Sequence, residues 1–148
     1  MTIIHDADAR GPGTHALVIG VGKYRHLRGG EMPRKQNLGL GQIKSPPISA
    51  MAFADWLLSE HQNPAAPAGS VELLLSPAQS YQLSSGQSIY IESATMANVE
   101  AAFFRWYEHC TAHNDNVAIF YFCGHGVKKT DLFLLPRGFR RQSSPAFP

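Results

Sequence analysis

Three short apolar runs, each bounded by polar residues or glycine, set the organisation of this chain. They span residues 15–22 (His-Ala-Leu-Val-Ile-Gly-Val-Gly), 71–75 and 117–123. Continuous runs of this kind predict strands that are buried on both faces, as in a parallel sheet. Two weaker patterns predict short strands at 87–92 and at 131–136, the latter reading Asp-Leu-Phe-Leu-Leu-Pro.

Helical periodicity fills two of the intervals between these strands. Ser45-Pro46-Pro47 predicts a helix start, with Ser45 as N-cap and proline in the first turn. Thr95 is expected to cap a second helix. The apolar face predicted for the first helix consists of Ala50, Phe53, Ala54, Leu57 and Leu58. The apolar face predicted for the second consists of Val99, Phe103, Trp106 and Cys110. Strands that alternate with helices indicate an α/β fold with a mostly parallel sheet and right-handed crossovers.

Composition narrows the class of protein. The chain has 148 residues, 44% of them apolar, which suits one domain with an ordinary core. A net charge of +2, without a basic block, argues against nucleic-acid binding. The sequence carries neither a signal-peptide pattern nor an apolar stretch long enough to cross a bilayer, so we expect a cytoplasmic protein without a membrane partner.

The best candidate for chemistry is His125, which lies between two glycines just after the 117–123 run. In open α/β sheets, catalytic groups collect at the carboxyl ends of strands, where this histidine is expected. Its ordinary pKa lies near neutrality, which suits proton transfer. The alternative is a histidine that only hydrogen-bonds its own loop.

Other constellations are weaker. Gly20 and Gly22 follow the first strand, as in a nucleotide-binding loop, but Arg25 stands where a third glycine belongs. His109 and His113 have the spacing of two zinc ligands on a helix, without the glutamate that the metalloprotease motif requires. We therefore expect no metal or organic cofactor, and keep nucleotide binding as a third hypothesis.

The order of these parts resembles the caspase and metacaspase superfamily of cysteine peptidases, over about residues 15–136. The most specific match is Phe120-Tyr-Phe-Cys-Gly-His-Gly126 with the following 131–136 segment, which looks like the family's catalytic-histidine region. Ala16-Leu-Val-Ile-Gly-Val-Gly-Lys-Tyr24 looks like its first strand, and residues 48–58 like its first helix. Cys123 departs from the more usual serine.

The resemblance implies a mostly parallel caspase-like sheet flanked by helices, a three-layer αβα fold that is incomplete at its C-terminal side. Residues 1–14 would be an N-terminal extension, 15–136 the caspase-like large-subunit domain and 137–148 an irregular tail. It also implies that His125 activates a cysteine thiol and that the backbone N–H of Gly126 is an oxyanion-hole donor. The substrate would be a peptide or protein.

The nucleophile is missing from the expected place. In caspases it follows the histidine by roughly 50 residues, which passes Pro148. Cys123 lies within the strand that positions His125, and Cys110 belongs to a packed helix, so neither is a good substitute. Three explanations stay open: a piece of a longer peptidase, a partner of a second polypeptide that carries the cysteine, or an inactive caspase-like interaction module. A missing central strand would leave apolar surface along one sheet edge, so we expect oligomerisation or poor solubility.

Cleavage specificity is also open. The 23–44 loop carries basic residues that would suit an acidic side chain: Lys23, Arg25, Arg28, Arg34 and Lys35. On the metacaspase side, Ser49 stands where many members carry Asp, which weakens the case for a basic-specific pocket. Neither preference follows from the sequence.

Overall fold

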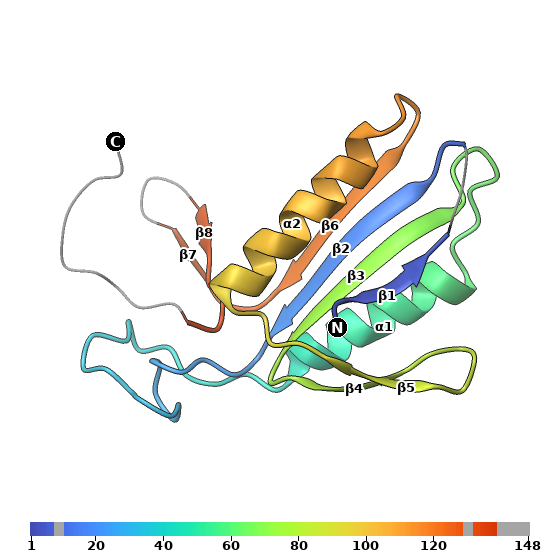
Figure 1. Ribbon diagram of the computed structural model, residues 1–148. Coiled ribbons are helices and arrows are strands. Elements are labelled where there is room, and N and C mark those ends of the chain that lie inside the picture. The colour runs from blue at the N-terminus through green and yellow to red at the C-terminus, as the bar shows by residue number, and fades with distance from the viewer. Residues whose placement is uncertain (8–10, 129–131, 139–148) are drawn as a thin grey trace.

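The computed structural model describes residues 1–7, 11–128 and 132–138, and its elements alternate between strands and helices (Figure 1). In chain order they are β1 (Ile3–Asp6), β2 (Thr14–Val21), α1 (Ser45–Ser59), β3 (Ala68–Ser76), β4 (Gln79–Gln82), β5 (Ser88–Ile91), α2 (Met96–Thr111), β6 (Val117–Cys123), β7 (Gly126–Lys128) and β8 (Leu132–Leu134).

A four-stranded sheet in the order β1-β3-β2-β6 forms the centre. β2 is parallel to both β3 and β6, with Gly20 opposite Leu75 on one side and Cys123 on the other. This confirms the predicted α/β class and the mostly parallel sheet. The carboxyl ends of these strands therefore lie together, at the end of the sheet where the 22–44 loop and the β7–β8 hairpin lie (Figure 1).

β1 was not predicted, because residues 1–14 carry no continuous apolar run. It pairs antiparallel with β3, so part of the expected N-terminal extension completes one edge of the sheet. Thr2 and Ile4 are buried there. The hydroxyl of Thr2 donates to Oε2 of the buried Glu72 at 2.9 Å, and Arg105 of α2 bonds the same carboxylate at 2.7 Å.

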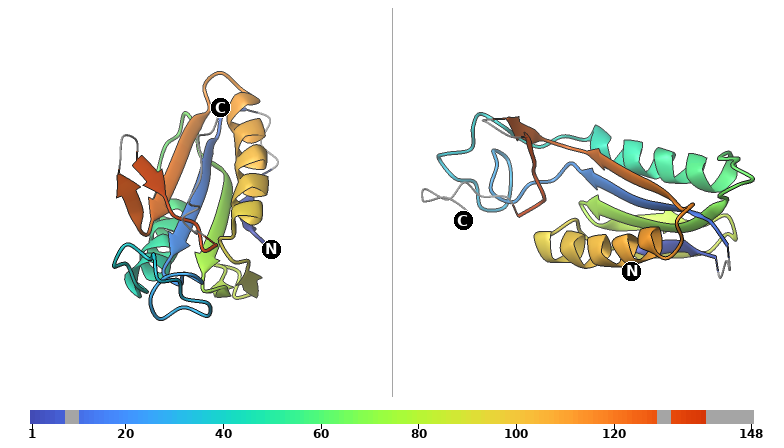
Figure 2. Two further views of the ribbon diagram at one scale, coloured as in Figure 1. Left: turned by 90° about the vertical axis from the view of Figure 1, so that its left-hand side faces the viewer. Right: turned by 90° about the horizontal axis from the view of Figure 1, so that it is seen from above.

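The two helices cover opposite faces of the sheet (Figure 2). α1 packs on one face through Ala50, Ala54 and Leu57, which are buried as predicted, while Phe53 and Leu58 are partly buried. The helix starts one residue earlier than expected. Lys44 is its N-cap residue, without a side-chain cap hydrogen bond, and Ser45 is its first helical residue.

α2 begins at the predicted cap, since Oγ1 of Thr95 accepts from the backbone N–H of Asn98 at 3.3 Å. The predicted sheet-facing stripe is displaced around the helix. Ala102 is the one buried residue of this helix, Val99 and Trp106 are partly buried, and Phe103 is 41% exposed. α2 packs mainly on β2 and β3, and its Trp106 ring lies 6.0 Å from the ring of Phe120 of β6.

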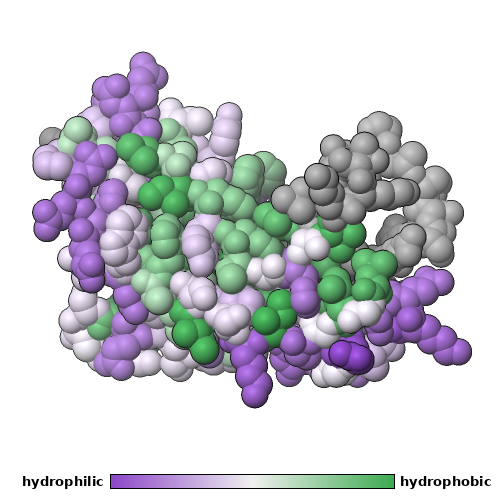
Figure 3. Space-filling view, turned by 180° about the vertical axis from the view of Figure 1, so that it is seen from behind, coloured by the Kyte–Doolittle hydropathy of each residue, from purple (hydrophilic) through white to green (hydrophobic). Residues whose placement is uncertain are grey.

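β6 is a strand parallel to β2, as predicted, but it is not buried on both faces. Among the described residues it pairs with β2 alone and forms an edge of the sheet. Its residues are partly buried or exposed, and Phe120 is 45% exposed. Seen from behind, on the side of α1, apolar residues form a band across the middle of the molecule (Figure 3).

Two hairpins lie outside the sheet. β4 and β5 pair with each other, which places the strand predicted at 87–92 in a hairpin whose first strand was missed. β7 pairs with β8, where a strand was predicted at 131–136. Asp131 and residues 139–148 of the predicted tail lie outside the described residues. In the part of the chain that the structure covers, no helix is both long and apolar enough to cross a membrane.

Candidate active site

His125 lies just beyond the carboxyl end of β6, in the short connection between β6 and β7. Its ring is partly buried, and two segments of the 22–44 loop hold it. This loop has no helix or strand, yet it is anchored: the backbone N–H groups of Gly22 and Lys23 donate to the Ser76 carbonyl at 2.7 and 2.9 Å. The loop therefore starts from a fixed point at the carboxyl end of β3.

Tyr24 is the first of the two holding groups. Its hydroxyl accepts from the backbone N–H of His125 at 2.6 Å, and the two ring centroids are 5.0 Å apart. The tyrosine is fully buried, and burial raises its pKa to about 12. The hydroxyl thus stays protonated at neutral pH and acts as a fixed part of the site.

Gly124 is required by this contact. A Cβ atom at position 124 would lie 2.7 Å from the Tyr24 hydroxyl oxygen and 3.1 Å from the Phe122 ring. Any side chain would displace the tyrosine from the His125 backbone. The glycine before the histidine therefore lets two chain segments approach closely.

The backbone carbonyl of Gly41 is the second holding group, 2.8 Å from Nε2 of His125. A carbonyl oxygen only accepts, so Nε2 carries the proton in the neutral ring. Nδ1 is then the basic nitrogen. The arrangement fixes the tautomer in the way that a histidine base requires, with one nitrogen oriented by an acceptor and the other left to take a proton.

The amide of Gly126 is directed away from β8. The backbone N–H of Leu135 donates to the His125 carbonyl at 3.0 Å, so this ladder bond lies one residue before the Gly126–Leu134 pair. Pairs alternate along an antiparallel ladder, so Gly126 and Leu134 form a non-hydrogen-bonded pair. The N–H of Gly126, an exposed residue, is therefore not used by the β7–β8 ladder.

Neither cysteine is placed as a nucleophile. Cys123 pairs with Gly20 inside the sheet and lies beside Tyr121, whose pKa is raised by burial and also by this thiol. Cys110 is on α2, and burial raises its pKa, which lowers its thiolate fraction at neutral pH. No hydrogen bond joins His125 to either sulfur, all three residues lying within the described ranges.

Two of the basic loop residues are already paired. Lys23 and Arg25 lie 3.4 and 3.9 Å from the carboxylate of Glu31, and Arg137 lies 2.9 Å from it. Arg137 and then Lys23 lower the pKa of this carboxyl group. A basic pocket for an acidic substrate side chain, as the loop composition suggests, would have to compete with Glu31.

The nucleotide hypothesis does not fit the loop geometry. A Cβ atom at Gly20 would lie 2.6 Å from the Pro46 carbonyl and 2.7 Å from Cβ of Ala50. At Gly22 it would collide with the Ile43 carbonyl and Pro47. Because Gly20 and Gly22 have no side chain, α1 and the end of the loop pack directly against β2. They fill the space that a bound phosphate would need.

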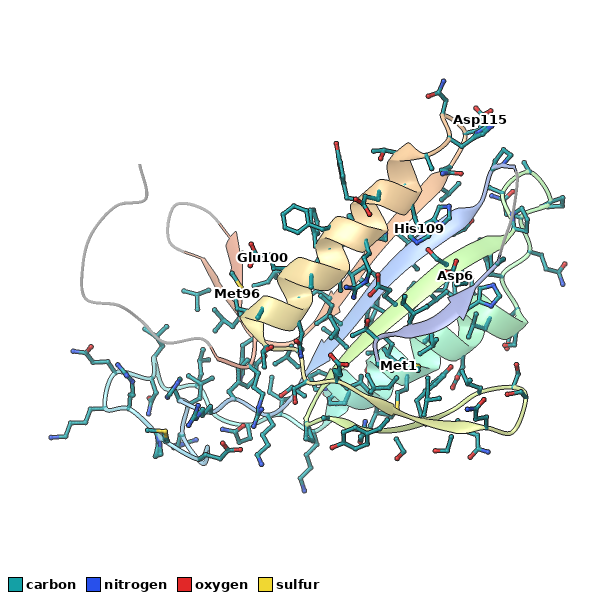
Figure 4. The ribbon with its side chains drawn as sticks, viewed as in Figure 1. Met1, Asp6, Met96, Glu100, His109 and Asp115 are labelled. Atoms are coloured by element: carbon teal, nitrogen blue, oxygen red, sulfur yellow. The ribbon has the colours of Figure 1, made fainter. Side chains whose placement is uncertain are left out.

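His109 and His113 lie at the opposite end of the sheet from His125, beside a cavity of about 170 Å³ that His15 and Asn116 also line. Figure 4 shows His109 on the side of α2 that is turned toward β1, the strand that carries Asp6, whereas Met96 and Glu100 point the other way. Over residues 1–7, 11–128 and 132–138, no three His, Cys, Asp or Glu side chains are grouped to hold a metal ion.

Sequence reasoning missed the loop residues that hold His125. Tyr24 stood in a polar, glycine-rich loop without periodicity, and Gly41 acts through its backbone. One signal was present, since Tyr24 and Leu27 are apolar residues among the charged, histidine and glycine residues of positions 23–31, and both are buried.

Comparison with known proteins adds little to this geometry. No family model matches the chain, and no solved structure matches it. The chain is similar to the uncharacterized protein y4kE of Sinorhizobium fredii (strain NBRC 101917 / NGR234), with 30% identity over 92 residues. That match covers 52% of this chain and 26% of the relative, so the chain spans about a quarter of the relative's length.

Proposed function

We propose that this chain is a caspase-like domain of a cysteine endopeptidase, which supplies the catalytic His125 and the oxyanion donor Gly126. The nucleophilic cysteine comes from a further segment or a second polypeptide. The observation that carries the proposal is the bond from Nε2 of His125 to the Gly41 carbonyl, which leaves Nδ1 as the base. The substrate is a peptide or protein in the cytoplasm, and no cofactor is required.

The reaction uses two groups of this chain. Nδ1 of His125 takes the proton of the incoming thiol, and the thiolate sulfur attacks the carbonyl carbon of the scissile peptide bond. The electron pair moves to the carbonyl oxygen, to which the Gly126 N–H donates. The intermediate collapses as the C–N bond breaks, and the imidazolium protonates the leaving amine. Water then hydrolyses the thioester, with His125 again accepting the proton.

The side of β6 that pairs with no other strand of the described residues is the proposed entry point of the nucleophile. A strand added in parallel to β6 would end at the same side of the sheet as His125, because parallel strands share the direction of their carboxyl ends. Apolar side chains beside this edge are available to cover it: Phe120 of β6 and Phe103 of α2, which both contact Trp106 at ring distances of 6.0 and 5.3 Å.

The test begins with the protein in its natural source, isolated with an antibody to residues 1–148. A peptide-based thiol-reactive probe would label the nucleophile, and mass spectrometry would locate it. We expect label on a cysteine other than Cys110 and Cys123. Replacing His125 with Ala should lower peptide hydrolysis at least 10²-fold, whereas the control His26→Ala, in the 22–44 loop, should retain it. Label on Cys123 or Cys110, or full activity without His125, would refute the proposal.

An inactive caspase-like interaction module is the second candidate. The observation that favours it is the apolar surface of β6 and α2, which serves docking whether or not chemistry follows. In this case a partner would bind the wild-type protein and the His125→Ala variant equally, and no cysteine of the complex would react with the probe.

A further inference from the structure

The two groups that hold His125 come from positions far apart in the 22–44 loop. The Tyr24 hydroxyl bonds its backbone, and the Gly41 carbonyl bonds its ring. The ring can keep its orientation only while these two positions keep a fixed separation. The loop has no helix or strand to set that separation, so some other contact must do so.

Gln42 provides this contact. Its Oε1 accepts from the backbone N–H of Tyr24 at 2.6 Å, and its Nε2 donates to the Tyr24 carbonyl at 2.9 Å. Nε2 also donates to the carbonyl of Arg28 at 3.0 Å. One amide side chain therefore pairs with both backbone groups of Tyr24, as a neighbouring strand would, while its own backbone directly follows Gly41.

We propose that Gln42 is a positioning residue for His125, acting by holding Tyr24 and Gly41 in register. The inference rests on the proposed function in so far as His125 is the catalytic base. Gln42 does not touch the imidazole, and its effect passes through the two groups that do. Backbone bonds from Arg28 to Leu40 and from Ile43 to Gly22, with a β-bridge between Arg28 and Gly41, also join the two sides of the loop. The bonds to the backbone of Tyr24 itself come from Gln42.

The substitutions follow from the three hydrogen bonds. Gln42→Ala removes all three. Gln42→Glu keeps an acceptor for the Tyr24 N–H but loses both donors, because a carboxylate only accepts. Gln42 is exposed, so neither change opens a cavity in the core. The matched control is Gln82→Ala, which removes a comparable amide bond, from Nε2 to the Gly86 carbonyl at 2.9 Å, in the β4–β5 hairpin.

The measurement is the hydrogen bond at Nε2 of His125, observed by nitrogen-15 NMR of the whole chain. We expect a protonated Nε2 whose hydrogen exchanges slowly in the wild type. In Gln42→Ala this exchange should be faster by roughly three- to tenfold, the effect of losing about one hydrogen bond. Gln42→Glu should fall between the two, and Gln82→Ala should match the wild type.

Unchanged exchange in Gln42→Ala and in Gln42→Glu would overturn the inference, as would an equal acceleration in Gln82→Ala. The amide spectrum of β2 and β3 checks that each variant is folded, and if Gln42→Ala is not, Gln42→Glu decides. The readout requires no peptidase activity. A protein that shows the expected exchange but never reacts with a thiol probe would therefore disprove the proposed function and leave the positioning role intact.

Discussion

The hydroxyl oxygen of Tyr24 lies 2.6 Å from the backbone nitrogen of His125, although 101 positions separate the two residues in the chain. The contact joins the loop after β2 to the connection after β6. Since those strands are parallel neighbours, their carboxyl ends bring the two segments together. The candidate base is thus positioned by the sheet through a buried tyrosine, and not by its own loop alone.

Replacing Tyr24 with Phe should destabilise the protein by about 1–3 kcal/mol, because the partly buried N–H of His125 would lose its acceptor. Urea unfolding measures this difference in the free energy of unfolding. The control is Tyr90→Phe, which removes an exposed hydroxyl of the β4–β5 hairpin and should change stability by less than about 0.5 kcal/mol. Equal effects in the two variants would show that the Tyr24 contact contributes nothing particular.

Replacing Gly124 with Ala should cost about 1–3 kcal/mol, the usual penalty for overpacking. The added Cβ would lie within 2.7 Å of the Tyr24 hydroxyl oxygen, so one of the two segments must move. Gly138→Ala is the control, because no atom lies within 4 Å of a Cβ at that position. Thermal unfolding compares them, and a neutral Gly124→Ala would show that the space beside Tyr24 is larger than described.

The sequence predicted the parallel part of the sheet and both helices because each is a local pattern. A buried parallel strand is a continuous apolar run, and a helix on a sheet has one apolar face. β1 was not predicted because Ile3–Asp6 is only four residues long and just two of them, Ile3 and Ile4, are apolar. The stripe on α2 was displaced because periodicity finds apolar positions but does not show which of them the sheet covers. Phe103 belongs to the pattern and is nevertheless 41% exposed.

The site was predictable only in part, for a related reason. His125 stands out as a histidine between glycines at the end of an apolar run. The acceptor that orients its ring is a backbone carbonyl, which leaves no trace in the type of residue at position 41. The role of Gln42 depends on the path of the loop, and the residue type at position 42 gives no sign of it.

The free energy of unfolding should decrease as the pH is lowered, because His15 takes up a proton more readily in the unfolded chain. Burial and then the neighbouring His109 lower the pKa of His15 from its ordinary value of 6.5, against the opposing effect of Asp6. The unfolded chain therefore binds the proton first, so this contribution is complete above about pH 6.5 and is lost as the pH falls through the lower folded pKa. Urea unfolding at a series of pH values measures the slope.

In that series, His15→Gln should flatten the slope below about pH 6.5, because the group with the shifted pKa is gone. The control is His26→Gln, which removes a histidine of the 22–44 loop and should leave the slope unchanged. An identical slope in wild type and His15→Gln would assign the acid sensitivity to other groups. The stacked rings of His15 and His109, 5.3 Å apart, also predict that His109→Gln reduces the slope in part.

The open edge of β6 should make the isolated chain associate with itself as concentration rises. Among the described residues no strand pairs with one side of β6, residues 117–123 carry no charge, and Phe120 of this strand is 45% exposed. Phe120→Lys places a charge on this edge and should shift the protein toward monomer in sedimentation-velocity experiments. Ile48→Lys, at an exposed apolar position of α1, is the control and should not. A monomeric wild type at all concentrations, or an equal shift in both variants, would show that association does not run through the β6 edge.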